Sequence, residues 1–323
     1  MERYMRKKLV VVCLAGLLAY KAVQFVCYKN PKKMSIATWN VQTFFDADFS
    51  GSEYSEYSST KSGWNSEKYF VRLLRLVDAL QEIDADIIAL EEIENISVAH
   101  DIIKLLPFSS KLHYAVFAKQ PGSALGLLVF SRYPITEAKA HQIQLPGIKP
   151  ESLRPVLEVH VKAGGKDTAV LVNHWKSKAS GGEKSGIIRQ CQSRLLAEWV
   201  FQLKKEAAKN ALIIAAGDFN QTTGEFETES GGRVLFRGSN FTETAESVWL
   251  NTANTSLGSY YFRENWEQID HIFLFSEKYS FGFCGTVKAR MFVHANGTPN
   301  SYKIYTGTGL SDHLPLKAEI YLR

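Results

Sequence analysis

The sequence is poor in cysteine. Four Cys occur among 323 residues, and two of them, Cys13 and Cys27, lie within the first 33. The other two, Cys191 and Cys284, are too few and too far apart to form a disulfide framework, so they either pair in an oxidising compartment or stay free and buried. The Cys and His residues show no zinc-site spacing. Stability must come from a hydrophobic core, and a hydrophobic content of 45% is enough to build one.

The main body of the chain also lacks an excess of positive charge. The pI is 8.8 and the net charge is +5, but residues 1–33 alone carry +7, because they hold eight Lys or Arg against one acid, Glu2. That leaves −2 for residues 34–323, with 30 basic and 32 acidic residues. The basic pI of the whole chain therefore gives no argument for a nucleic-acid partner.

A recognisable cleavage site is missing from the N-terminal segment, which otherwise has the marks of a targeting sequence. Four basic residues precede an apolar run over 9–20, the length of a signal-peptide core. With the apolar stretch after Lys21, the two runs reach about 20 residues, enough to span a bilayer if Lys21 snorkels. No small-x-small site occurs near 19–27. We expect residues 1–33 to be a signal peptide or membrane anchor, and the protein to reside in the cell envelope or to be secreted.

Residues 34–323 contain no internal repeat, low-complexity tract or linker, which favours a single domain. Residues 46–63 predict a surface loop, and 222–259 are polar and poorly patterned. The remaining pattern predicts two sheets packed together, with helices outside. The expected strands cover 35–41, 86–93, 114–118, 126–131, 156–162, 168–175, 212–217, 268–275 and 314–322. The expected helices cover 66–83, 97–106 and a stretch from about 186 to 208.

The first expected helix has a clear start and a clear apolar face. Ser66 is the predicted N-terminal cap. The helical period places a set of apolar residues on one side, which we expect to face the core. These residues are Phe70, Leu73, Leu74, Val77 and Leu80.

Several buried strands end on polar side chains. The clearest case is 212–220, LIIAAGDFN, whose first half is an unbroken apolar run typical of a strand buried on both faces. Asp218 and Asn220 are two residues apart, so in extended chain they point the same way. A strand followed by an Asx turn would also explain this stretch taken alone.

The other strand ends carry the same kinds of groups. The set is Asn40, Glu92, His174, Asp218, Asn220, Asp270, Asp312 and His313. Carboxylate and amide oxygens suit a hard cation such as Mg²⁺, and two His supply a base and an electrostatic partner near neutral pH. A cation, a base and hydrogen-bond donors are what phosphodiester hydrolysis requires.

Six motifs, in this order, resemble the endonuclease/exonuclease/phosphatase superfamily. They are Asn40 after a strand, Glu92 after DIIALE, then NHWKSK, GDFN, IDHIF and SDH. The resemblance covers residues 34–323 and implies an α/β fold, the four-layer α/β/β/α sandwich. In that fold two mostly antiparallel sheets pack face to face with helices outside.

The resemblance also implies roles for these residues. Glu92 would be the principal ligand of Mg²⁺, with Mn²⁺ or Ca²⁺ as alternatives, and Asn40 and Asp312 would stand beside it. The catalytic set would be His174, Asp218, Asn220, Asp270 and His313, with Asp270 in contact with His313 and orienting it. Glu91 and His271 are expected to be structural neighbours, and Arg132 to belong to a turn.

Four basic residues are expected to meet the substrate. Arg154, in LRP before a strand, matches an Arg that faces the substrate phosphate in the family. The segment 173–189 resembles a bacterial subgroup of secreted or envelope nucleases. In it Lys176 and Lys178 would meet phosphates and Arg189 would support them. A solvated loop with ordinary charges is the alternative for this segment.

The resemblance favours a Mg²⁺-dependent nuclease that acts on DNA or RNA, works as a monomer and touches the membrane through residues 1–33 if these are not cleaved. A phosphatase or a sphingomyelinase-like phospholipid phosphodiesterase is the alternative on the same fold. Ala216 before Gly217, and EQIDHIF at 267–273, differ from the inositol polyphosphate phosphatases, which carry Trp and a PAWCDR-like run there. A non-catalytic binding protein would keep the fold, but every expected catalytic position is occupied.

Overall fold

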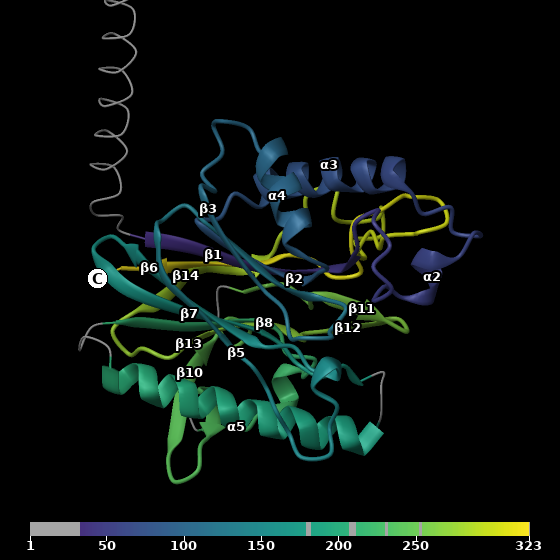
Figure 1. The fold of residues 1–323 in the computed structure, drawn as a ribbon. Helices are drawn as coiled ribbons and strands as arrows, with labels where there is room; N and C mark the ends of the chain where they lie inside the picture. The colour runs from purple at the N-terminus through teal and green to yellow at the C-terminus, as the bar shows by residue number, and fades with distance from the viewer. Residues whose placement is uncertain (1–32, 179–181, 207–210, 230–231, 252–253, 323) are drawn as a thin grey trace, which may run out of the picture.

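The computed structural model describes residues 33–178, 182–206, 211–229, 232–251 and 254–322 (Figure 1). The expected targeting segment, apart from Lys33, lies outside these residues. Within them, no helix is both long and apolar enough to cross a membrane. The described residues thus belong to the body of the chain.

The first sheet has six strands in the order β14-β15-β1-β2-β4-β3. Their bounds are β1 Lys33–Phe44, β2 Ile87–Ile93, β3 Tyr114–Ala118, β4 Gly126–Ser131, β14 Ser280–Thr286 and β15 Leu316–Tyr321. β1 and β2 run parallel, and the other neighbours are antiparallel. The two parallel strands therefore deliver their C-terminal ends to the same edge of the sheet.

The second sheet has seven strands in the order β5-β6-β7-β8-β13-β10-β9. Their bounds are β5 Ile135–His141, β6 Val156–Ala163, β7 Lys166–His174, β8 Leu212–Asp218, β9 Val234–Arg237, β10 Thr242–Ser247 and β13 Asp270–Leu274. Only the neighbours β7 and β8 are parallel. A separate hairpin consists of β11 Tyr260–Phe262 and β12 Asn265–Glu267.

Helices cover the outer faces of both sheets (Figure 1). α3 Ser66–Ile83 and α4 Ile96–Leu105 share a core with the first sheet, and α5 Gly182–Glu206 shares one with the second. The short elements are α2 Ser55–Ser58 and the 3-10 turns η1 Pro150–Ser152 and η3 Thr223–Glu225. The expected four-layer α/β/β/α sandwich, with two mostly antiparallel sheets, is confirmed.

The period of two along each strand sorts side chains between these layers. On β1, Met34 and Ile36 lie in the core between the sheets, whereas Trp39 and Val41 face α3 and α4. Strands buried on both faces need apolar residues at every position, and this is why they read as unbroken apolar runs. The same rule decides which strand-end groups face the gap between the sheets.

Helix α3 spans the expected residues, but its N-terminal cap differs from the predicted one. Its N-cap is Asn65, whose side-chain oxygen accepts from the Lys68 N–H at 2.9 Å, so Ser66 is the first helical residue rather than the cap. The predicted apolar face was also partly wrong. Phe70 and Leu74 are 50% and 41% exposed. Tyr69 and Leu76 are buried instead, so the packed stripe is rotated relative to the predicted one.

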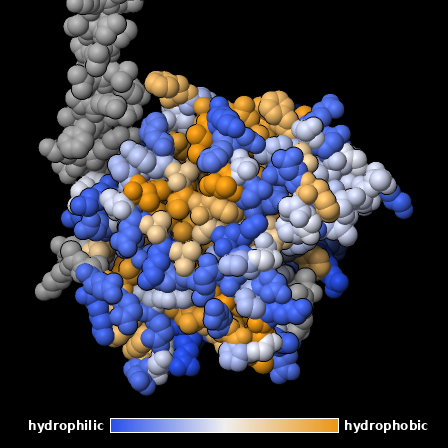
Figure 2. All heavy atoms as spheres, in the orientation of Figure 1, coloured by the Kyte–Doolittle hydropathy of each residue, from blue (hydrophilic) through white to orange (hydrophobic). Residues whose placement is uncertain are grey.

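The strands that the sequence pattern missed are short, exposed or irregular. β5 is an edge strand with five exposed residues, so its side chains do not alternate between core and water. β9 and β10 lie within 222–259 and are short, and β11 and β12 have three residues each. Figure 2 agrees with a sandwich whose outer surfaces are solvated, because hydrophilic residues cover most of the visible face and hydrophobic ones appear among them in smaller groups.

Cys191 and Cys284 are both free. Cys284 is buried, and Cys191 is partly exposed. Of the two alternatives left by the sequence, the structure shows two unpaired thiols rather than a disulfide.

Candidate active site

The polar strand ends continue the rows of apolar residues that fill the gap between the sheets. On β8, Leu212, Ile214 and Ala216 belong to the inter-sheet core, and Asp218 is the next residue on that face. β7 repeats this arrangement, with His174 as the next residue after Val172 on the same face. The inter-sheet core therefore ends in a polar cluster at one edge of the sandwich.

The second sheet places three of these groups in one row. Asp218 is the register partner of His174 on β7 and of Asp270 on β13. This arrangement needs a glycine at 217, where φ is +141° and an added Cβ would lie 1.9 Å from the Asn173 carbonyl oxygen. Regular pairing and one close backbone approach are enough to align His174, Asp218 and Asp270.

The first sheet reaches the cluster through a bulge. Between Glu91 and Ile93 the pairing of β2 shifts, so Glu92 is an extra residue, and its φ is +69°. A bulge re-aims a side chain at the cost of local strain. The Glu92 carboxylate accepts from the Thr43 N–H at 2.6 Å and from Asn40 Nδ2 at 3.2 Å. It therefore turns into the site.

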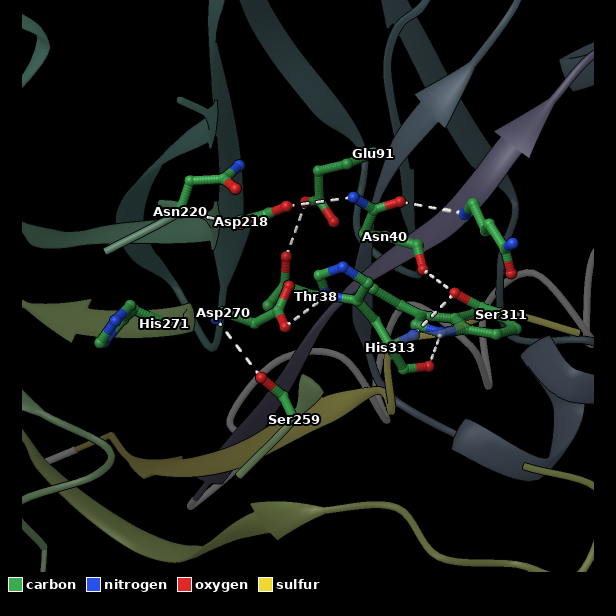
Figure 3. Close-up of polar contacts among 12 residues, drawn as sticks. Thr38, Asn40, Glu91, Asp218, Asn220, Ser259, Asp270, His271, Ser311 and His313 are labelled. Atoms are coloured by element: carbon green, nitrogen blue, oxygen red, sulfur yellow. Dashed lines mark hydrogen bonds and ion pairs between the residues drawn. The ribbon is translucent and has the colours of Figure 1, made fainter. Parts of the chain in front are cut away.

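Glu91 stays on the regular inter-sheet face. It is fully buried and accepts from the Thr38 hydroxyl at 2.7 Å (Figure 3). Burial raises the pKa of Glu91 well above its usual range, and the Asp270 and Asp218 carboxylates add to this effect. Burial therefore favours the neutral form of Glu91, which lies beneath the site as a structural neighbour.

Asn40 joins the two sheets. Its Nδ2 donates to Glu92 Oε1 at 3.2 Å and to Asp218 Oδ2 at 3.1 Å, and its Oδ1 accepts from the Gln42 N–H at 3.0 Å. Asp218 also accepts from the Asn220 N–H at 2.8 Å. Figure 3 shows Asn40 and Asp218 pointing toward each other from neighbouring sheets.

Asp270 and His313 are in contact, as expected from the motifs. His313 Nδ1 and Asp270 Oδ2 are 2.8 Å apart, and both side chains are buried. The backbone of His313 is fixed by Ser311 Oγ and by the Trp39 indole N–H, which donates to its carbonyl. Burial by itself opposes the imidazolium, but the Asp270 carboxylate outweighs it and the pKa of His313 is raised well above its usual range. His271, the chain neighbour of Asp270, points away from the cluster (Figure 3) and binds the Gln221 carbonyl.

Burial favours the neutral forms of His174 and Asp218, in contrast to the charged form of His313. Burial lowers the pKa of His174 well below its usual range, so its imidazole is neutral, and its Nε2 lies 3.7 Å from both Glu92 and Asp218. Burial, followed by the Asp270 carboxylate, raises the pKa of Asp218 to about 7. The site thus holds a charged His, a neutral His and a carboxylate that titrates near neutral pH, which are the properties that acid–base work requires.

The three expected metal ligands, Asn40, Glu92 and Asp312, line one pocket of about 550 Å³. The carboxylates in it are crowded: burial raises the pKa of Asp312, His313 opposes this and Glu92 adds to it. Over the described residues, the His, Cys, Asp and Glu atoms that converge within 4.8 Å belong to Asp218, Asp270 and His313, which the family resemblance assigned to catalysis. Oxygen donors with mutually repelling charges fit a hard divalent cation.

The walls of this pocket are cationic and aromatic. Arg154 and Lys178 line it, and Lys178 also binds Glu225 at 2.7 Å. The β11–β12 hairpin contributes Tyr260 and Phe262, with the Tyr260 ring 4.7 Å from that of His313. The sequence pattern did not predict this hairpin, because three-residue strands carry no readable period. The run Tyr260-Tyr261-Phe262 was the one available signal.

Two of the predicted substrate-binding residues lie elsewhere. Arg189 is buried and does not line the pocket; its guanidinium donates to the Lys176 carbonyl at 3.1 Å and to Ser185 Oγ at 3.3 Å. This contact supports the chain that carries the lysines. Lys176 lines a second, neighbouring cavity.

Solved structures of low sequence identity share this fold. A truncated TDP2 from Caenorhabditis elegans is 13% identical, covers 91% of this chain and 99% of its own, and has a TM-score of 0.58. An endonuclease/exonuclease/phosphatase protein from Bacteroides vulgatus is 16% identical, with coverages of 91% and 100% and a TM-score of 0.59. A mannosyl-6-phosphatase from Bacteroides thetaiotaomicron is 18% identical, with coverages of 90% and 100% and a TM-score of 0.56. Among curated protein sequences none matches significantly.

Structural likeness at such low identity shows only the fold, whereas a match to a family model shows the family. The model of the endonuclease/exonuclease/phosphatase family matches residues 35–321, from β1 to the end of β15, and so includes every residue that lines the pocket. This family contains nucleases and phosphatases, which hydrolyse phosphoester bonds and typically depend on a divalent metal. Motif order, layer architecture and family match agree, and the chain therefore belongs to the endonuclease/exonuclease/phosphatase family.

Proposed function

We propose that this protein is a metal-dependent phosphodiester hydrolase that cleaves nucleic acid in the cell envelope or outside the cell, acting as a monomer. One observation carries the proposal. His313 and the Glu92–Asn40–Asp218 group line one pocket, with Arg154 and Lys178 on its walls, and Asp270 holds His313 from behind the pocket surface. Such a pocket offers a base, a fixed cation and oxyanion donors around one phosphate.

The side chains divide the work between them. Asp218, titrating near neutral pH and bound by Asn40 and Asn220, orients the attacking water and accepts its proton. The water oxygen bonds to phosphorus as the bond to the leaving oxygen breaks. His313, charged and held at Nδ1 by Asp270, presents Nε2 to a non-bridging phosphate oxygen. Glu92, with Asn40 and Asp312, would hold a Mg²⁺ ion, and such an ion neutralises charge on the phosphate and the leaving oxygen.

The hairpin favours a nucleic-acid substrate. Phe262 is 47% exposed, lies 6.1 Å from the Tyr260 ring in a stacked arrangement, and carries the Arg263 guanidinium over its face at 5.0 Å. Aromatic and guanidinium planes of this kind stack on bases, for about 1–3 kcal/mol per base. A sugar phosphate would leave this apolar surface uncovered.

A phosphatase acting on a small phosphate ester is the second candidate. The mannosyl-6-phosphatase named above has the same fold, and a pocket of about 550 Å³ is in the ordinary range for a small ligand. A phospholipid phosphodiesterase would depend on residues 1–33 as an anchor. A small phosphate ester does not explain the aromatic hairpin, whereas exposed aromatic side chains also occur at membrane interfaces, so the substrate assay must include a lipid.

An assay panel with the full-length chain tests the proposal. The substrates are single-stranded DNA, plasmid DNA, RNA, sphingomyelin and mannose 6-phosphate, each with Mg²⁺, Mn²⁺, Ca²⁺ or EDTA, and His313→Ala is the inactive control. We expect turnover of nucleic acid with a divalent ion and none in EDTA. Turnover of sphingomyelin or mannose 6-phosphate alone would refute the nuclease proposal and support its alternatives. Fractionation of cells that express the full chain and a chain lacking residues 1–33 tests the location; both forms in the cytoplasm would contradict it.

A further inference from the structure

A second cavity of about 380 Å³ adjoins the catalytic pocket. Three lysines line it: Lys149 beside η1, Lys176 after β7, and Lys184 on the first turn of α5. No carboxylate is among the lining residues. The body of the chain carries a net charge of −2, so three lysines facing one cavity without an acid is a local departure from its overall balance.

The two cavities are lined by neighbouring residues of the same two segments. Ser152 and Lys176 line the second cavity, whereas Arg154 and Lys178, each two residues further along the chain, line the catalytic pocket. Two residues of extended chain span at most about 7 Å. A substrate held at the catalytic groups and running over these two segments therefore reaches the lysines.

The lysines keep their hydrogen-bonding capacity. In the part of the chain that the structure describes, none of the three forms an ion pair, whereas Lys178 binds Glu225 at 2.7 Å. Lys176 Nζ has a single long contact, 3.5 Å to the Ser152 carbonyl. Burial lowers the pKa of Lys176, and the Arg154 charge adds to this, so an anion placed here would relieve the crowding. The serine hydroxyls are already used, because Ser152 donates to the Lys149 carbonyl and Ser185 to the Gly182 carbonyl.

The wall between the cavities is held rigidly from beneath. The backbone N–H of Lys176 donates to Gln192 Oε1 at 2.9 Å, and its carbonyl accepts from Arg189 at 3.1 Å. Gln192 and Arg189 are both buried on α5. The backbone of Lys176 is therefore fixed before a ligand arrives, so binding need order only its side chain, which lowers the entropic cost.

We infer that the second cavity binds a further phosphate of the polynucleotide whose scissile phosphate sits in the catalytic pocket, with Lys149, Lys176 and Lys184 as its ligands. This inference rests on the proposed nuclease function. It makes the enzyme selective for chains over mononucleotides, because only a substrate with at least two phosphates fills both cavities.

The test uses the double variant Lys149→Ala, Lys184→Ala in the full chain. Both side chains are exposed, and neither lines the catalytic pocket. With a single-stranded oligonucleotide we expect KM to rise about fivefold with kcat unchanged, and the slope of log(kcat/KM) against log[salt] to become shallower by about 1. With bis(p-nitrophenyl) phosphate, which has one phosphate, both constants should stay the same.

The control variant is Lys61→Ala, Lys139→Ala, which removes the same charge from exposed lysines that line neither cavity. If the wild type cleaves the oligonucleotide, and the Lys149/Lys184 variant has the same KM and salt slope as this control, the inference is wrong and the nuclease proposal stands. If the wild type cleaves only small esters, both fail together. Calorimetric titration with inorganic phosphate shows whether the cavity binds free phosphate rather than a phosphate of the chain. If the wild type binds free phosphate, the Lys149/Lys184 variant does not, and the two cleave the oligonucleotide equally well, the ligand is free phosphate and the inference is overturned.

Discussion

The two sheets contribute to the site in different ways. The second sheet supplies His174, Asp218 and Asp270 through undisturbed register, as the next residues on faces that are apolar up to that point. The first sheet supplies Glu92 through a bulge, with left-handed backbone at Gln42, Thr43 and Glu92. The half on the second sheet thus extends ordinary packing, whereas the half on the first sheet has strained backbone that neighbouring residues hold in place. Variants in each half test that division.

Glu91 and Glu92 give the largest contrast. We expect Glu92→Gln to lower turnover by about 10³-fold or more, because it removes the charge that the bulge aims at the metal site. Glu91→Gln should change turnover little, since burial favours the neutral form of Glu91 and Gln has nearly the same shape. Turnover with increasing Mg²⁺, with melting curves for both variants, measures this. Equal losses in the two variants, or full wild-type activity in EDTA, would remove the assigned metal role.

The regular half of the site depends on Gly217. In Gly217→Ala the new Cβ would lie 1.9 Å from the Asn173 carbonyl oxygen, at a φ of +141°. We expect the free energy of unfolding to fall by about 3 kcal/mol or more, because β7 and β8 must separate. Gly224→Ala, where nothing lies within 4 Å, is the matched control and should be nearly neutral. Urea unfolding of both variants measures the two free energies of unfolding. Similar values would mean that the close approach of Gly217 to Asn173 is not needed.

The strained half depends on Arg72. This residue is 1% exposed, and its guanidinium donates to the carbonyls of Val41, Gln42 and Thr43 while stacking on the Tyr302 ring. Arg72→Met removes a donor from the Val41 and Gln42 carbonyls, whereas the Thr43 carbonyl keeps the Phe45 N–H and the Tyr57 hydroxyl. We expect a loss of about 2–3 kcal/mol of stability and a higher Mg²⁺ requirement, because the Thr43 N–H that binds Glu92 moves. Arg72→Lys should restore part of both. A Met variant that loses stability but keeps its Mg²⁺ dependence would show that Arg72 does not position Glu92.

The smallest expected effect lies on the second sheet, away from the site. Glu158 binds His141 at 2.7 Å and His160 at 2.6 Å. Burial opposes ionisation of Glu158, but the two His lower its pKa to about 2; the same contact raises the pKa of His160. The raised pKa of His160 contributes stability that is complete below pH 6.5 and is lost as the pH rises through the pKa of the folded state. The lowered pKa of Glu158 contributes stability that is complete above pH 4.5 and is lost as the pH falls toward 2.

The variant Glu158→Gln should therefore flatten the pH dependence of unfolding. We expect the wild type to lose up to about 1 kcal/mol more than the variant between pH 6 and pH 9. Turnover should be unaffected, because the cluster lies outside the pocket. Parallel stability curves for the two proteins would show that the contact contributes nothing measurable.

The contrast between the regular second sheet and the bulged first sheet also explains which parts of the site could be predicted from the sequence. The strand over 212–218 and its Asp are readable because a doubly buried strand is apolar at every position, so the first charge marks its functional end. Glu91 and Glu92 are adjacent acids, and a bulge that inverts their directions leaves no mark on periodicity; the family resemblance was needed to choose between them. The β11–β12 hairpin is too short for a period, and its place over His313 depends on long-range packing.

The central claim is that groups distant in sequence, Asp270 on β13 and His313 before β15, act as one unit where the sheets meet. The most direct test is a double-mutant cycle of Asp270→Asn and His313→Ala, measured as kcat/KM on single-stranded DNA. We predict a large loss from His313→Ala and little further loss on adding Asp270→Asn, because residues that act together are strongly non-additive. Losses that multiply in the double variant would show that the two residues act independently and would contradict the account.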